Sequence, residues 1–214
     1  MSKIDILSGL DTNRIVSKDI KKELIMRKYI ANYKYLESSG VKLFTVVLLP
    51  EESKKFPTVI IRSPYVDKFE DEKEENIAIE YLNVYKEWLN SGYAVVVQHC
   101  RGRGKSDGDC IPYINEREDG LCLQAWIRKQ DFYNGELFLK GQSYLTSVHY
   151  ATAPFADDIK GAIFAIQDSE RYNICCRNGF LKKGLYSEQT TAKIAHNTVY
   201  LQNSFLKLPI DKTI

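Results

Sequence analysis

Apolar positions in this sequence form two kinds of pattern that alternate along the chain. Short runs rich in Val, Ile and Leu predict strands at residues 40–50, 58–61, 93–98, 137–139 and 159–166. Between them, residues 77–90 and 116–130 have apolar side chains at helical spacing. Because strand and helix alternate from residue 58 to residue 166, we predict an α/β fold with a mostly parallel sheet flanked by helices. Ligands bind such sheets at the carboxyl ends of the strands.

The two ends of the chain have different patterns. Before residue 37, Lys, Ile, Asn and Tyr are mixed around a predicted helix that follows Ser17 and runs to about Tyr29. Residues 187–205 are also typical of a helix. We therefore expect an N-terminal helical extension at residues 1–36, the core at 37–169 and a partly helical region at 170–214.

Composition and charge exclude several classes of function. The chain has 214 residues, of which 44% are hydrophobic and 27% charged, as in ordinary soluble domains. The net charge of +2 argues against a polyanionic partner, so we expect no nucleic acid and no membrane partner. No apolar run approaches the length of a membrane span, and residues 1–11 lack the apolar core of a signal peptide. We therefore expect a cytoplasmic protein.

The five cysteines do not form a recognisable metal or disulfide pattern. Their number is odd and no CxxC spacing occurs, so neither a zinc site nor a disulfide framework is indicated. Free thiols fit a reducing compartment. We expect no metal and no cofactor. The adjacent pair Cys175-Cys176 could form a redox pair, although small buried side chains are the commoner role of such residues.

One stretch of the sequence predicts chemistry. Residues 137–153 begin as an apolar run, reach Gly141-x-Ser143 and continue without Gly or Pro. This pattern is typical of a strand, a sharp turn and a helix, with Ser143 on the turn. A serine in that place presents its hydroxyl above the end of a sheet, as a nucleophile does. A simple helix N-cap is the alternative, because the full elbow pattern has Gly where this chain has Leu145.

A second loop raises a rival function. Residues 102–106 end in Gly-Lys-Ser after a strand, as a phosphate-binding loop does. However, the first glycine of that motif would fall at His99, and the carboxylates and proline that follow Ser106 cannot open a phosphate-binding helix. Nucleotide binding is therefore disfavoured. We expect Arg101 to pair with a carboxylate and fix the loop.

Several motifs follow one another in a characteristic order. They are Ile61-Arg62-Ser63-Pro64-Tyr65, then residues 93–97 leading to Arg101-Gly102 and Gly104-x-Ser106-x-Gly108, then Glu118-Asp119-Gly120 with Trp126-Ile127, then Gly141-x-Ser143-Tyr144-Leu145. Over roughly residues 40–184 the chain resembles the α/β-hydrolases of the cocaine esterase and X-Pro dipeptidyl-peptidase family. The resemblance implies an α/β-hydrolase fold and a serine hydrolase that acts on a small-molecule ester or a peptide substrate.

The resemblance also assigns roles to individual residues. It implies that Ser143 is the nucleophile, and that the backbone amide of Tyr144 and the phenol of Tyr65 are the two oxyanion donors. A hydroxyl and an amide that converge on one point can stabilise charge that develops only in the transition state. Taken alone, Tyr65 could be a turn residue after a proline, and Tyr144 an aromatic residue at a helix start.

The sequence also departs from the family's pattern. The family has Gly where this chain has Thr146, so we expect a tighter contact of helix and strand at the elbow and weaker activity. The family's triad continues with an Asp and a His beyond a helical insertion. Of the three histidines, we expect His99 and His149 to be core or surface residues, and His196 is a remote candidate. Asp168 is the candidate acid, because it follows the strand predicted at residues 159–166, where some α/β-hydrolases have the acid of the triad.

Two functions remain open at this stage. Residues 170–214 resemble the start of the helical cap insertion, and we expect the chain to end inside it. The first hypothesis is a serine hydrolase completed by a C-terminal hydrolase fragment that supplies Asp and His. The second is a catalytically inactive remnant that acts as a binding or interaction module. In either case we expect the strand at residues 159–166 to be an open edge that favours self-association.

Overall fold

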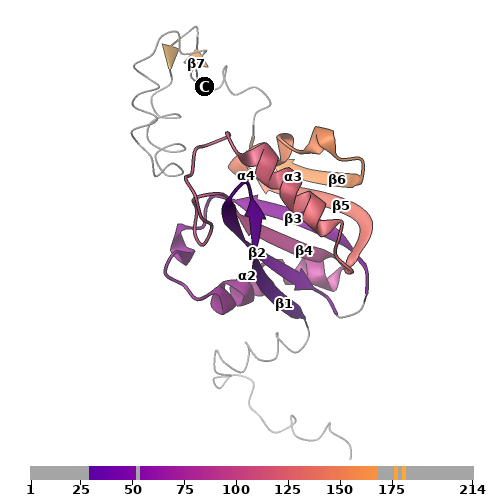
Figure 1. Ribbon diagram of the computed structural model, residues 1–214. Helices are drawn as coiled ribbons and strands as arrows, with labels where there is room; N and C mark the ends of the chain where they lie inside the picture. The colour runs from indigo at the N-terminus through magenta and orange to yellow at the C-terminus, as the bar shows by residue number, and fades with distance from the viewer. Residues whose placement is uncertain (1–28, 52–53, 168–175, 178–179, 182–214) are drawn as a thin grey trace, which may run out of the picture.

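The computed structural model describes residues 29–51, 54–167, 176–177 and 180–181. Its centre is a six-stranded sheet, in the spatial order β1-β2-β4-β3-β5-β6 (Figure 1). The strands are β1 (Ile30–Ser38), β2 (Val41–Leu49), β3 (Phe56–Ser63), β4 (Ala94–His99), β5 (Tyr133–Gln142) and β6 (Ile159–Ala165). Strands β3 to β6 are mutually parallel, whereas β2 pairs antiparallel with both β1 and β4. The predicted mostly parallel sheet is confirmed.

Helices cover the two faces of this sheet. The main helices are α2 (Glu74–Asn90), α3 (Glu116–Ile127) and α4 (Tyr144–Tyr150), and the short 3-10 turns are η1 (Asp67–Phe69) and η2 (Ala153–Phe155). On β3, Val59 and Ile61 belong to the core cluster under α2, whereas Ile60 belongs to the cluster under α3. Because neighbouring strand residues point to opposite faces, α2 and α3 lie on opposite sides of the sheet.

The position of β4 in the sheet explains its apolar sequence. Every residue of β4 is buried, because β4 lies between β2 and β3 and both of its faces are covered. A strand buried on both faces needs a continuous apolar run, which Val95, Val96 and Val97 provide. Burial of each such side chain contributes about 1.5–3 kcal/mol. The run of valines therefore fixes β4 in the middle of the sheet.

The expected helical extension at residues 1–36 is wrong for residues 30–36, which lie in strand β1. This strand pairs with β2 along its whole length, from Ile30 opposite Leu49 to Ser38 opposite Val41. The rings of Tyr33 and Tyr35 pack on Phe44, with centroids 5.9 and 5.5 Å apart. The core sheet therefore begins at Ile30. The helix predicted to follow Ser17 lies outside the described residues.

The expected helical region at residues 170–214 lies mostly outside the described residues. Where the structure describes it, the chain forms the antiparallel pair β7 (Cys176–Arg177) and β8 (Phe180–Leu181), and the helix predicted at residues 187–205 lies outside the described residues. Asn-Gly, the sequence at positions 178–179, is the commonest signal of a two-residue hairpin connection. Among the described helices, none combines the length and the apolar character that a membrane span requires.

Candidate active site

Ser143 lies on a sharp turn between β5 and α4, at the carboxyl end of the parallel strands. Its backbone has φ 55° and ψ −128°, a conformation that non-glycine residues rarely adopt. The amide of Ser143 donates a hydrogen bond to the carbonyl of Ala165 on β6 (2.9 Å), and its carbonyl accepts one from the amide of Thr146 (2.8 Å). The surrounding structure thus holds a strained residue in place, as is common at functional sites. The predicted strand, turn and helix are confirmed.

Gly141 allows the helix to approach the strand at this turn. A Cβ atom at Gly141 would lie 2.5 Å from the backbone C and O of Leu145 and 2.6 Å from the amide nitrogen of Thr146. These are backbone atoms of the first turn of α4, which cannot move aside as a flexible side chain can. Thr146, where the resembled family has Gly, is fully buried and its hydroxyl faces the carbonyl of Ala165 at 3.4 Å. The chain therefore accommodates Thr146 between α4 and β6.

The structure brings Tyr65 to Ser143. Tyr65 follows β3, and its amide donates a hydrogen bond to the hydroxyl of Ser63 (3.1 Å). The phenol oxygen of Tyr65 lies 3.5 Å from Oγ of Ser143, and the side chain is 48% exposed. The amide of Tyr144 belongs to the first residue of α4, where the helix itself offers no acceptor. The three residues that the sequence singled out therefore meet at one end of the sheet.

The ring of Tyr144 is buried beside the site and is held by a carboxylate. Its hydroxyl donates to Oε1 of Glu116 (2.9 Å) and accepts from the amide of Tyr113 (2.8 Å). The ring of Tyr113 packs on it, with centroids 4.8 Å apart. Burial and the charge of Glu116 raise the pKa of Tyr144 far above its usual range. Tyr144 is therefore a neutral hydrogen-bond donor.

Sequence reasoning missed the charged residues behind Tyr144. Arg62 at the end of β3 is fully buried, and its Nη1 donates to Oε2 of Glu116 (2.9 Å). Although burial by itself lowers the pKa of Arg62, Glu116 and its neighbours raise it above the ordinary value. A usable signal was present in the sequence. An arginine directly after the buried run Val59–Ile61 must find a buried partner, because an unpaired charge there is too costly.

The loop after β4 is fixed by protein contacts and not arranged for phosphate. As predicted, Arg101 pairs with a carboxylate, donating to both oxygens of Asp119 at 2.6 and 3.1 Å. The ammonium of Lys105 donates to the carbonyl of Glu70, and the hydroxyl of Ser106 lies between the amide of Phe44 and the carbonyl of His99. Because α3 begins only at Glu116, no helix starts at this loop. A phosphate-binding loop is therefore not formed.

The two described histidines are core residues, as predicted, and neither contacts Ser143 in the described part of the chain. His99 accepts from the amide of Lys105 at Nδ1 (3.2 Å), so its Nε2 donates to the hydroxyl of Tyr81 (2.8 Å). His149 donates from Nε2 to the carbonyl of Lys140 (3.1 Å). Burial lowers the pKa of each histidine to about 3. Asp168 and His196 lie outside the described residues. Within the described ranges, no three potential ligands gather into a metal site.

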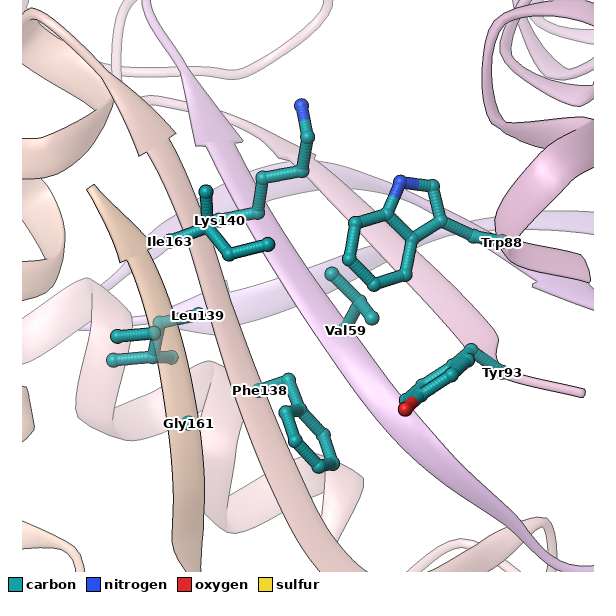
Figure 2. A pocket seen from close by; sticks show the side chains of 9 residues that line it. Val59, Trp88, Tyr93, Phe138, Leu139, Lys140, Gly161 and Ile163 are labelled. Carbon is teal, nitrogen blue, oxygen red and sulfur yellow. The ribbon is translucent and has the colours of Figure 1, made fainter. Parts of the chain in front are cut away.

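A separate apolar groove lies on the α2 face of the sheet, between α2 and strands β5 and β6. Its volume is about 310 Å³. Figure 2 shows the side chains of Trp88, Val59 and Tyr93 on one side of the groove, and those of Phe138, Lys140 and Ile163 on the other. Ile163 on β6 is 56% exposed. The groove therefore continues onto the open edge strand of the described sheet.

Sequence comparison identifies relatives of this chain. A family model for X-Pro dipeptidyl-peptidases of the S15 family matches residues 39–204. The cocaine esterase of Rhodococcus sp. (strain MB1 Bresler) is 30% identical over 114 residues, which are 53% of this chain and 19% of that protein. The chain thus spans about a fifth of the length of this curated relative.

Three of the solved structures with a similar fold are hydrolytic enzymes by name. An aminopeptidase from a marine sediment Thaumarchaeota archaeon superposes with a TM-score of 0.52 at 18% identity, covering 72% of this chain and 28% of the other. An α-amino acid ester hydrolase gives a TM-score of 0.51 at 21% identity, covering 74% and 28%. A CocE/NonD family hydrolase from Staphylococcus aureus gives 0.51 at 21% identity, covering 63% and 27%. The fold of this chain is that of the α/β-hydrolases.

Proposed function

Because this chain belongs to the X-Pro dipeptidyl-peptidase family S15, we propose that it is the nucleophile-bearing part of a serine hydrolase that cleaves ester or amide bonds. One observation carries the proposal. A serine in a strained turn at the carboxyl end of a parallel sheet lies 3.5 Å from the hydroxyl of Tyr65, where a substrate carbonyl could meet both groups.

The proposed reaction begins with attack of Oγ of Ser143 on the substrate carbonyl, while its proton passes to a base. The carbonyl oxygen becomes an oxyanion, which accepts hydrogen bonds from the hydroxyl of Tyr65 and the amide of Tyr144. Collapse of the tetrahedral intermediate expels the alcohol or amine, which takes up the proton. Water then hydrolyses the acyl-serine by the same steps and releases the acid.

We infer that the base lies outside the described residues. His99 and His149 are buried, and the two nitrogens of His99 are occupied by protein groups. A pKa of about 3 also leaves these imidazoles unable to hold a proton near neutral pH. We propose that the imidazole is supplied by a C-terminal hydrolase region, with Asp168 as a candidate for the acid that orients it.

The surface next to the site supports such a partner. In the described sheet, β6 pairs only with β5. Ile163 on β6 is 56% exposed, and Ile166, just after the strand, is 76% exposed. The solved relatives contain more than twice as much chain as they share with this one. We propose that a hydrolase C-terminal region pairs with the edge of β6 and fills the groove beside Trp88. Without it, the same edge favours self-association.

A fluorophosphonate probe, which reacts with activated serines, tests the proposal. We expect the probe to label Ser143 when the chain is co-expressed with a C-terminal region of an S15-family hydrolase, and to leave Ser143→Ala unlabelled. Equal labelling of the chain alone would contradict the proposal that the base is supplied from elsewhere. No labelling in any form would contradict the proposed nucleophile.

A binding or interaction module without catalysis is the second candidate. The burial of both described histidines favours it, since neither can serve Ser143. A monomeric chain with one cooperative thermal transition and no labelling would support this function. We also propose a cytoplasmic location, which the free thiols of Cys100 and Cys110 support.

A further inference from the structure

A row of buried polar side chains runs through the protein from the sheet to the serine turn. The amide of Gln98 on β4 donates to the hydroxyl of Thr45 on β2 (3.1 Å), and its oxygen accepts from Nε of Arg62 on β3 (2.9 Å). Arg62 holds Oε2 of Glu116 on α3, and Oε1 of Glu116 accepts from Tyr144 on α4 (2.9 Å). Three strands and two helices are thus joined by hydrogen bonds.

We propose that Arg62 and Glu116 are positioning residues that hold the amide of Tyr144 at its working distance from Tyr65. This inference rests on the proposed function, in which these two groups bind the oxyanion. Arg62 lies on the strand that leads directly into Tyr65, and Glu116 binds the ring of the residue that carries the other donor. One ion pair therefore connects the two halves of the oxyanion site.

The packing around this ion pair leaves it little freedom. Nη1 of Arg62 also donates to the carbonyl of Glu116 (2.9 Å), so the guanidinium holds both the backbone and the side chain of that residue. Nη2 has no hydrogen bond in the described structure and lies 3.8 Å from Oδ2 of Asp119. A Cβ at Gly120 would lie 2.5 Å from Cγ2 of Thr152 and 3.3 Å from Nη1 of Arg62. Because Gly120 has no side chain, α3 can pack closely against Thr152 and Arg62.

The protein contains a matched control at the opposite end of β5. The hydroxyl of Tyr133 donates to Oδ2 of Asp158 (2.7 Å), and Arg128 donates to both oxygens of Asp158 at 2.6 and 2.7 Å. This is the same tyrosine, carboxylate and arginine arrangement, but it lies where β5 begins, whereas Ser143 follows its end. Tyr133→Phe therefore removes a tyrosine-to-carboxylate hydrogen bond at the other end of the strand.

Amide NMR signals test the positioning without requiring activity. In Tyr144→Phe, which keeps both charges and the ring, we expect the amide signals of Ser143 and Leu145 to shift, because the ring loses its anchor. Glu116→Gln should shift them in the same direction, if it folds. Tyr133→Phe should leave both signals in place. Unchanged signals in Tyr144→Phe would overturn the inference, whether or not Ser143 is reactive.

The labelling rate of Ser143 and ester turnover then test whether this positioning matters for activity. In the form of the protein that the fluorophosphonate labels, we expect Tyr144→Phe to lower the labelling rate of Ser143 roughly 10-fold to 10²-fold, the cost of a misplaced donor. On a small ester, we expect kcat to fall while KM stays the same. The kcat is calculated per folded enzyme, so that a loss of folded protein is not counted as a loss of activity. Wild-type rates in Tyr144→Phe would refute the positioning role. An unlabelled wild type would instead contradict the proposed function and leave the NMR result to decide the inference.

Discussion

Replacing Gly141 with alanine tests whether the turn at Ser143 depends on close contact between β5 and α4. The added Cβ would lie 2.5 Å from two backbone atoms of Leu145 and 2.6 Å from the amide nitrogen of Thr146. Carbon atoms in proteins do not approach so closely, so the first turn of α4 must move away from the strand. Overpacking of this kind costs about 1–3 kcal/mol.

Thermal unfolding followed by circular dichroism measures this cost. For a domain of this size, 1–3 kcal/mol corresponds to a decrease in Tm of about 2–12 °C. Because α4 carries the amide of Tyr144, the labelling rate of Ser143 should fall as well. The two losses should occur together, since one displacement causes both.

Gly161→Ala is the matched control, in the neighbouring strand β6. There the Cβ would meet only the ring of Phe138, at 3.2 and 3.3 Å, and that ring borders the open groove and can yield. We expect a change in Tm close to zero. The reasoning is refuted if Gly141→Ala is as stable and as reactive as Gly161→Ala.

Three further predictions concern other parts of the protein. Tyr65→Phe should lower kcat on a small ester roughly 10²-fold in steady-state assays with little change in KM, and unchanged turnover would remove Tyr65 from the site. Burial lowers the pKa of His149 from 6.5 to about 3, so the unfolded state binds its proton first as the pH falls. The contribution of His149 to the free energy of unfolding is therefore fully present above pH 6.5. It is lost as the pH falls toward 3, by up to about 1.4 kcal/mol per pH unit. Denaturant titrations at several pH values should give a shallower loss in His149→Gln, and equal slopes would contradict this. Ile163→Lys should reduce the dimers or aggregates that we expect at micromolar concentration, and light scattering that shows the same mass for both proteins would argue against association through β6.

The sequence was most informative where side chains are buried on both faces of the sheet. Runs such as Val95 to Val97 have one interpretation, because only a central strand uses apolar residues continuously. The serine turn was recognisable for a similar reason, since its Gly141 is required by a backbone contact that no other residue permits. The pairing of Tyr65 with Ser143 was implied by the family resemblance, and the structure places their oxygens 3.5 Å apart.

Strand β1 could not be predicted from its sequence pattern. Among its nine residues only Leu36 and Ser38 are buried, and the rings of Tyr33 and Tyr35 remain 37% and 41% exposed. A strand at the edge of a sheet needs little apolar surface, so its alternation is weak. The buried pair of Arg62 and Glu116 was missed for another reason. The partners are far apart in sequence, and nothing local to either residue identifies the other.

The central position of β3 also determines when the serine turn can form. Val59 on β3 pairs on one side with Val95 of β4, and on the other with Phe138 of β5, which lies much later in the chain. Pairing between segments so far apart forms slowly, and a ribosome delivers β5 only after β4 and α3 have been made. We therefore expect one edge of β3 to stay open while the first half of the sheet assembles. The serine turn follows β5 and is also bonded to Ala165 of β6, so we expect a chain arrested before this edge closes to have most of its sheet and no strained turn at Ser143.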